Sequence, residues 1–367
     1  MKIECIKEKL NIAVSKAEKV SGKNLTLPVL SCLLFETRKN LLYIKSTNLD
    51  LGIEISIPVK VEEEGSTAIP AQVLNNFLVN TDDDKNIIIE TTENNNIKIY
   101  TSSNQAVIKT HPKDDFPTIP LVDTDKTFKI NSNDLIKGLR AVSFSSSVST
   151  MRPEFSSVYM YPIEESVVFV ATDSFRLAEK KIKTKRPLDF APIMLPFKNT
   201  IEIMRIFGDI DNDVEIGITK NQASFVCDNI YVVSRVVDGS FPDYKQIIPK
   251  EFKTQATVLK QDLINTLKIS NIFSDSFNQV NIKITPNAKS FTIKSKNANV
   301  GENVNSIDSV IEGEDIEANF NYKYILDCLA FIDTDSVTLF FNGVTKPMVI
   351  RGTGDKTYTY LVMPMNR

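Results

Sequence analysis

The sequence repeats one unit three times, at a spacing of about 125 residues. The string Thr47-Asn48-Leu49-Asp50-Leu51 returns 125 residues later as Thr172-Asp173-Ser174-Phe175-Arg176-Leu177, and more loosely at 295–299. Pro70, which opens a second shared segment, recurs at Pro196. A period of this length corresponds to a whole domain and not to a solenoid repeat. We therefore expect three similar domains, at residues 1–121, 122–249 and 250–367.

Each unit is predicted to contain two helices and several strands. Apolar residues spaced three and four apart predict a first helix in each unit, over 5–22, 131–144 and 260–273. A second helix is predicted over 70–80, 196–208 and 320–331. Alternation such as Ile53-Glu54-Ile55-Ser56-Ile57 predicts strands between the helices. The expected order is helix, strands, helix, strands, and the expected fold class is α+β, with two helices on an antiparallel sheet layer.

The distribution of charge is more informative than its sum. The formal net charge is −3, so the composition as a whole does not indicate nucleic-acid binding. The predicted helices nevertheless carry 12 Lys and Arg against 7 Asp and Glu, which leaves the strands and loops net acidic. One interpretation is chance surface charging. The other is that the helices face phosphates, through contacts that read no sequence and weaken in salt. The helices counted span 7–23, 70–80, 131–150, 196–208, 260–277 and 320–331.

Residues that would support catalysis or metal binding are scarce. The single histidine, His111, has no evident Ser or Cys partner. The pattern Asp209-x-Asp211-x-Asp213 resembles the start of an EF-hand loop, but Val214 stands at the glycine position and Lys220 at the glutamate position. We interpret the acidic run Asp82-Asp83-Asp84 as a solvated loop. We expect no catalytic residue, no metal and no cofactor.

The cysteines and the absence of a signal segment indicate a reducing compartment. Cys5, Cys32, Cys227 and Cys328 lie far apart, with neither zinc-site nor disulfide-framework spacing. Met1 to Cys5 lacks the apolar core of a secretory signal, and no apolar run is long enough to cross a bilayer. We expect isolated thiols, no membrane association and a cytoplasmic location.

Four longer strings stand in a fixed order along the chain. They are Leu27-Pro28-Val29-Leu30, Ala171-Thr172-Asp173-Ser174-Phe175-Arg176-Leu177, Val237-Asp238-Gly239-Ser240-Phe241-Pro242-Asp243-Tyr244 and Tyr360-Leu361-Val362-Met363-Pro364-Met365. Taken together, over the whole chain, they resemble the beta subunit of bacterial DNA polymerase III, the sliding clamp family. The resemblance implies that the chain is a non-catalytic processivity factor. It also implies that two copies join head-to-tail into a homodimeric ring of six domains. Such a ring encloses double-stranded DNA without sequence specificity, with helices inside and sheets outside.

The resemblance also implies a hydrophobic pocket for short peptides. Its partners would be the DNA polymerase III catalytic subunit, the clamp loader, other polymerases and repair proteins. Such peptides bury leucine and aromatic anchors, and methionine adapts to several of them. A different interpretation of the C-terminal string is a plain edge strand of the core. The implied pocket residues are Phe155, Thr172, Phe175, Arg176, Leu177, Pro242, Ile247, Leu361, Val362, Met363, Pro364 and Met365.

Two further sets of residues follow from the resemblance. The DNA-facing candidates are Lys16, Lys19, Lys23, Lys137, Arg140, Lys198, Arg205 and Lys323. The dimer-interface candidates are Ala106, Ile272 and Phe273. Ser174 and Phe175 differ from the residues of many relatives, which favours a more apolar pocket. Asn24, Pro153 and Glu154 stand where relatives often carry DNA-touching residues, so those contacts are not transferred.

Two other function classes remain open at this point. A carboxylate-and-metal nuclease would need acidic residues clustered on rigid elements, and would cleave plasmid in magnesium with activity lost in Asp82→Ala. A sequence-specific DNA-binding protein would need an element that reaches base edges, and would leave a footprint on one preferred sequence.

Overall fold

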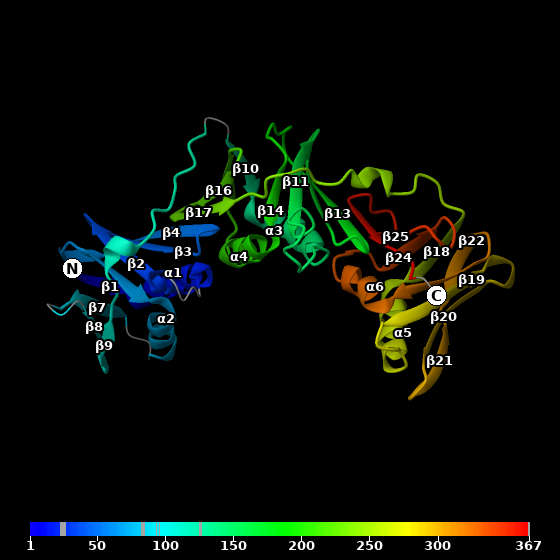
Figure 1. Ribbon diagram of the computed structural model, residues 1–367, viewed down its shortest axis with the longest axis horizontal. Coiled ribbons are helices and arrows are strands. Elements are labelled where there is room, and N and C mark those ends of the chain that lie inside the picture. Colours follow the sequence, from blue (N-terminus) through cyan, green and yellow to red (C-terminus); the bar gives the residue numbers. More distant parts are fainter. Residues whose placement is uncertain (23–26, 82–84, 93, 95, 125–126, 366–367) are drawn as a thin grey trace. The chain divides into compact units, whose positions relative to one another are not determined.

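The computed structural model describes residues 1–22, 27–81, 85–92, 94, 96–124 and 127–365. The chain forms two compact units, shown in Figure 1. The first unit comprises Met1–Ile136 and Lys198–Val236, and the second comprises Lys137–Phe197 and Val237–Arg367. The chain therefore enters each unit twice, and the border divides the helices α3 (Ser132–Ser143) and α4 (Phe197–Phe207).

The first unit holds two antiparallel sheets, ordered β5-β1-β7-β8-β9 and β10-β15-β16-β17-β4-β3-β2-β6. In the second of these sheets, β17 and β4 join the middle third of the sequence to its first third. The helices that lie wholly within this unit are α1 (Lys7–Val20) and α2 (Ala71–Asn80). The strands are β1 (Lys2–Ile6), β2 (Cys32–Arg38), β3 (Leu41–Thr47), β4 (Leu51–Pro58), β5 (Lys60–Glu63), β6 (Ser66–Pro70), β7 (Asn86–Thr91), β8 (Asn96–Tyr100), β9 (Gln105–Lys109), β10 (Thr127–Asn131), β15 (Asp213–Ile218), β16 (Gln222–Cys227) and β17 (Ile230–Arg235).

The second unit also holds two antiparallel sheets, ordered β14-β11-β12-β13-β26-β25-β24-β18-β22 and β21-β20-β19-β23. Here β13 pairs with β26, which brings the middle of the chain beside its last strand. The helices that lie wholly within this unit are α5 (Lys260–Ile272) and α6 (Tyr322–Leu329). The strands are β11 (Ser157–Ile163), β12 (Ser166–Thr172), β13 (Arg176–Lys183), β14 (Ile193–Pro196), β18 (Thr254–Leu259), β19 (Gln279–Thr285), β20 (Ser290–Asn297), β21 (Gly301–Ser306), β22 (Ser309–Gly313), β23 (Ile316–Asn321), β24 (Ser336–Phe341), β25 (Met348–Gly352) and β26 (Tyr358–Val362).

Helix α1 packs on β3 and β4 through the apolar face that its sequence predicts. Leu10, Val14 and Ala17 are fully buried, and their spacing places them on one side of the helix. The helix begins at Lys7 and not at Cys5 as predicted, because residues Lys2–Ile6 form β1 and pair with β7. Ile6 is therefore outside the helix, and its side chain is 46% exposed.

Helix α3 packs closely on β12 because Gly138 has no side chain. A Cβ added at Gly138 would stand 2.4 Å from Cε2 of Phe169, whose side chain is fully buried. The helix ends at Ser143, so the prediction that it includes Phe144 was wrong. Phe144 instead stacks on Phe331 and on Tyr360, with ring centroids 5.0 Å and 5.7 Å apart.

The predicted fold class is confirmed, since the helices pack on antiparallel sheets in both units. The second helices lie within two residues of their predicted ends. The expected order within a repeat was wrong, because a short strand precedes each first helix: β1 before α1, β10 before α3 and β18 before α5. Within the described residues, no helix is both long and apolar enough to span a bilayer.

Candidate partner-binding surface

The turn between β12 and β13 holds Phe175 at the surface. Asp173 Oδ1 accepts hydrogen bonds from the main-chain N–H groups of Phe175 and Arg176, both at 3.0 Å. Thr172 Oγ1 donates to the carbonyl of Arg176 at 2.7 Å. Ser174 has a φ of +76°, in the left-handed region that few non-glycine residues adopt. The turn is thus fixed by its own side chains, and Phe175 remains 63% exposed.

Arg176 ties this turn to helix α6. Its side chain is only 13% exposed, and Nε lies 3.1 Å from Asp173 Oδ2. One terminal nitrogen lies 2.6 Å from Asp327 Oδ2, and the other donates to the Phe144 carbonyl at 2.7 Å. The guanidinium also lies over the Tyr324 ring, 4.4 Å from its centroid. Arg176 therefore acts as a structural clamp and leaves little of its guanidinium for a partner.

The chain's last strand lies beside this turn. Leu177 pairs with Leu361 and Arg176 with Val362 in the β13–β26 ladder. Beyond the strand, the Met363 N–H donates to the Phe175 carbonyl at 2.8 Å, and the Met365 N–H donates to the Asn319 carbonyl at 2.8 Å. The main chain of the tail is thus anchored at two points, and its side chains are partly exposed.

Several predicted pocket residues form the floor beneath this surface. Thr172, Leu177, Leu361 and Val362 are buried, with at most 6% of each exposed. Leu177 and Leu361 share a core cluster with Tyr244, whose hydroxyl donates to Glu179. Burial, followed by the Glu179 carboxylate, raises the pKa of the Tyr244 hydroxyl far above its ordinary range. The sequence reasoning did not place Tyr244 or Asp327 at the site.

The remaining predicted residues are exposed or half-buried. Ile247 follows the short helix Tyr244–Gln246, its N–H donates to the Tyr244 carbonyl at 3.0 Å, and it is 47% exposed. Pro242 is half-buried one turn earlier. Phe155 is half-buried beneath Arg152, whose guanidinium lies 4.2 Å from the ring centroid. We name Phe175, Ile247, Met363, Pro364 and Met365 the C-terminal patch. Its apolar side chains, which are exposed at Phe175 and Ile247 and partly exposed in the tail, lie on a fixed main chain and can receive apolar anchors of a partner.

The DNA-facing candidates differ in how freely they could meet phosphate. The ammonium of Lys16 donates to Asp209 Oδ1 and to the Ile206 carbonyl, both at 2.5 Å, and its side chain is 11% exposed. Lys16 is therefore engaged within the first unit. Arg140, Lys198 and Lys323 are exposed. Lys23 lies outside the described residues.

Three other DNA-facing candidates already hold a carboxylate. The pairs are Lys19 with Glu18 at 3.2 Å, Lys137 with Asp333 at 2.7 Å and Arg205 with Glu202 at 2.7 Å. The hydrogen bond from Lys137, with its charge, keeps the pKa of Asp333 below the ordinary value. Both side chains of the Lys137–Asp333 pair are exposed, and an exposed pair is worth no more than about 1 kcal/mol. A phosphate can therefore exchange with the carboxylate at little cost.

All four sheets are open, so each ends in strands with an outer edge that no other strand of the described chain pairs with. Among these edge strands are β9 in the first unit and β21 in the second. Val107 on β9 is 58% exposed, and Val304 on β21 is 57% exposed. The interface candidate Ala106 lies on β9, while Ile272, which is 62% exposed, ends α5. Phe273 follows it and is half-buried.

Three family models match consecutive thirds of the chain. The N-terminal domain of the DNA polymerase III beta subunit matches residues 1–120, the central domain matches 129–243, and the C-terminal domain matches 245–366. The chain belongs to the DNA polymerase III beta subunit family.

Relatives and solved structures of this family match along the whole chain. The beta sliding clamp of Synechococcus elongatus is 26% identical over 372 residues, covering 100% of this chain and 99% of the relative. The crystal structure of the DNA polymerase sliding clamp from Bacillus subtilis is 26% identical, with a TM-score of 0.94, covering 100% of this chain and 99% of that one. The DNA polymerase III beta subunit from Thermotoga maritima is 25% identical, also with a TM-score of 0.94 and the same coverage.

Among the described residues, the acids and the histidine singled out in the sequence make ordinary structural contacts. The described residues contain no group of three or more His, Cys, Asp or Glu side chains that could hold a metal ion. Of the EF-hand-like acids, Asp209 pairs with Lys16 and Asp211 accepts a hydrogen bond from Asn133 at 2.7 Å. The side chain of His111 is exposed, and its main-chain N–H donates to the Ala68 carbonyl. The run Asp82-Asp83-Asp84 and Asn24 lie outside the described residues.

Proposed function

We propose that two copies of this chain close head-to-tail into a ring around duplex DNA. The observation that carries the proposal is the match of three beta-subunit domain models in order along one chain. Because the chain belongs to this family, its function is that of a processivity factor, a sliding clamp. We divide it into clamp domains at residues 1–121, 122–249 and 250–367, so that a dimer has six.

The unpaired edges of β9 and β21 are our candidates for the joint between copies. An exposed edge strand is a template for pairing with another chain, and a heterologous contact closes into a ring when its rotation allows. Val107 and Val304 would meet partner side chains there. We place Ala106, Ile272 and Phe273 around the same joint. We expect Ile272→Asp to lower the dimer fraction, and Val79→Asp, an equal change at another exposed helix position, to leave it unchanged.

Within the ring, DNA would be enclosed and not gripped. The exposed cations Arg140, Lys198 and Lys323 would meet phosphates transiently, and the paired ones, such as Lys137, would exchange their carboxylate for phosphate. Contacts of this kind are independent of sequence and weaken in salt. Sliding follows because no contact depends on one position of the DNA.

The C-terminal patch would dock short peptides of the proteins that the ring retains. Phe175 and the two methionines offer apolar surface that adapts to leucine and aromatic anchors. The partners we expect are the DNA polymerase III catalytic subunit, the clamp loader, other polymerases and repair proteins. We further propose that the chain is non-catalytic and works in the cytoplasm.

Retention on DNA of different topology tests encirclement. The protein is loaded on nicked circular plasmid, freed of unbound protein by gel filtration, and the DNA is then linearised. We expect the protein to remain on circles and to leave linear molecules within minutes. A control with both ends of the linear DNA blocked by bound protein should restore retention. Equal retention on open linear and circular DNA would overturn the ring.

A deletion tests the patch separately. Removing Met363 to Arg367 should abolish stimulation of the polymerase while leaving formation of the dimer intact. Normal stimulation by the shortened chain would refute the assignment of the patch.

A further inference from the structure

The first repeat contains the same turn that presents Phe175 in the second. Asn48 Oδ1 accepts hydrogen bonds from the N–H groups of Asp50 and Leu51, at 3.0 Å and 2.8 Å. Thr47 Oγ1 donates to the Leu51 carbonyl at 2.9 Å. Leu49 has a φ of +78°, close to the +76° of Ser174. The turn at Thr47–Leu51 thus reproduces, bond for bond, the turn that lies 125 residues later.

The neighbouring strand is repeated as well. β17 pairs with β4 in the way that β26 pairs with β13. The Arg235 N–H donates to the Asp50 carbonyl at 2.8 Å, just as the Met363 N–H donates to the Phe175 carbonyl. Asp50 therefore stands where the C-terminal patch has Phe175, and Arg235 stands where it has Met363. The first unit holds the same main-chain framework with charged side chains in place of apolar ones.

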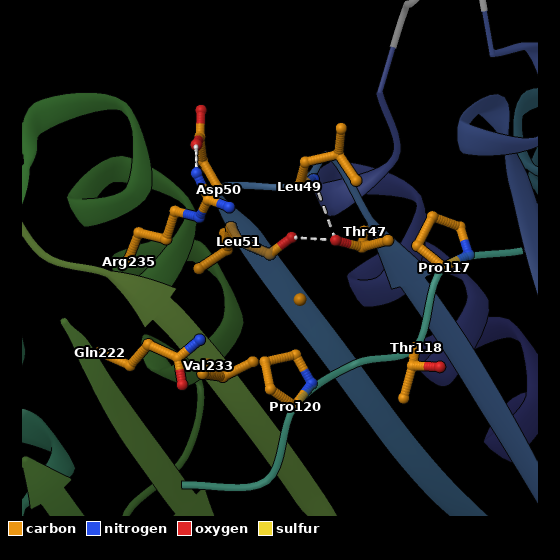
Figure 2. Close-up of a pocket in the computed structure, with 11 residues that line it drawn as sticks. Thr47, Leu49, Asp50, Leu51, Pro117, Thr118, Pro120, Gln222, Val233 and Arg235 are labelled. Carbon is orange, nitrogen blue, oxygen red and sulfur yellow. Dashed lines mark hydrogen bonds and ion pairs between the residues drawn. The ribbon is translucent and has the colours of Figure 1, made fainter. Parts of the chain in front are cut away.

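This framework carries a pocket of about 370 Å³, shown in Figure 2. That volume is within the range of pockets that hold small ligands. Leu51 and Val233 are buried at its base, and Leu49, at its mouth, is 44% exposed. Pro117 and Pro120 line the pocket from the segment that follows β9.

A glycine shapes the base of the pocket. Gly52 corresponds to Leu177 in the second repeat, and a Cβ there would lie 3.0 Å from Ile119 and 3.3 Å from Val233. In the second repeat Leu177 packs on Tyr244 instead. The two sites therefore share a main-chain framework but differ in the side chains that line them, and we expect them to bind different ligands.

We infer that this pocket binds a second class of short peptide, one with a leucine-sized anchor followed by a carboxylate. The anchor would pack against Leu49 and Val233, and the carboxylate would meet Arg235. The Arg235 side chain is 66% exposed, and Asp50 Oδ1 is 3.9 Å away, beyond hydrogen-bonding distance. Guanidinium groups bind carboxylates through paired hydrogen bonds. The Asp50 carboxylate repels a second carboxylate, so the acidic residue of the peptide is confined to the side of the anchor that faces away from Asp50.

The inference rests on the proposed function, because the C-terminal patch is what identifies the shared framework as a peptide site. The test uses the full chain with labelled Leu and Val methyl groups, observed by NMR. The probes are the peptide Gly-Ala-Leu-Glu-Ala-Gly and the same peptide with glutamine in place of glutamate. We expect saturable shifts at Leu49, Leu51 and Val233, and about fivefold weaker binding of the glutamine peptide.

Two variants with equal charge loss separate a specific contact from general attraction. Arg235→Ala should make the two peptides bind equally. Lys220→Ala, at an exposed position outside the pocket, should preserve their difference. Shifts confined to the methyl groups around Leu361, or none at millimolar peptide, would overturn the inference. So would equal binding of both peptides to the unaltered chain.

The deletion of Met363 to Arg367 separates this inference from the proposed function. Pocket shifts must survive in the shortened chain, and polymerase stimulation must not. If stimulation is lost and the pocket shifts are also absent from the intact chain, the inference fails and the proposed function stands. If the pocket shifts persist but stimulation is normal, the assignment of the C-terminal patch fails and the pocket stands.

Discussion

Replacing Gly138 with alanine sets two opposing effects against each other in α3. Alanine favours a helix over glycine by about 1 kcal/mol. The new methyl group, however, would stand 2.4 Å, 2.5 Å and 2.8 Å from three atoms of the Phe169 ring. The ring is rigid and fully buried, so it must shift by roughly 1 Å in a close-packed site.

The steric effect should win. Overpacking of this kind costs about 1–3 kcal/mol, and three ring contacts below 3.0 Å favour the upper end of that range. We expect Gly138→Ala to destabilise the second unit by about 1–2 kcal/mol after the helix term is subtracted. For a unit of this size the melting temperature should fall by roughly 2–8 °C.

Calorimetry and a double-mutant cycle measure this balance. Phe169→Leu alone should destabilise, because it leaves a cavity. In the Phe169→Leu background, Gly138→Ala should be neutral or stabilising, since the ring that it strikes is gone. A rise in melting temperature for Gly138→Ala alone, or equal effects in both backgrounds, would refute the reasoning.

Three further outcomes are expected. Phe175→Asp should weaken binding of an apolar partner peptide at least about tenfold while leaving the melting temperature unchanged, because the side chain is 63% exposed; normal binding would count against the patch. The Lys137 hydrogen bond lowers the pKa of Asp333 in the folded chain, so the stability from this pair is present at neutral pH and is lost as pH falls through the lowered value. A double-mutant cycle of Lys137→Ala and Asp333→Asn measures the coupling free energy of the pair. A coupling free energy that grows between pH 5 and pH 2 would contradict this direction. Burial raises the pKa of Cys5 to about 12, and all four cysteines are buried and unbridged. A thiol reagent at pH 8 should therefore label the native chain slowly and react with four thiols after denaturation. Rapid labelling of the native chain would contradict that burial.

The sequence predicts the fold well where one repeat confirms another. The second helices were located closely because each starts beside a matching strand end, at Pro70, Pro196 and Asn321. The short strand β1 was missed because five residues of alternating pattern, Lys2–Ile6, run directly into an amphipathic helix. Pairing with β5 and β7 determines that strand, and those partners lie more than 50 residues away.

The candidate site was predictable in its local parts alone. Thr172, Asp173 and Arg176 belong to one turn, and a short string is enough to indicate it. The ion pair between Arg176 and Asp327 joins residues 151 positions apart, and no local sequence pattern specifies it. The engagement of Lys16 by Asp209 is equally remote, so the sequence did not show that this lysine is held within the chain.

The ladder between β17 and β4 has a mechanical consequence. Main-chain pairs from Ile230–Ile55 to Ser234–Leu51 connect the first and middle thirds of the sequence without using the covalent segment between them. A protease cut near Pro117 or Pro120 would therefore leave two fragments that stay together through a gel-filtration column. The hydrogen bonds of this ladder hold the two segments together, so cleavage of the peptide link between them would not separate them.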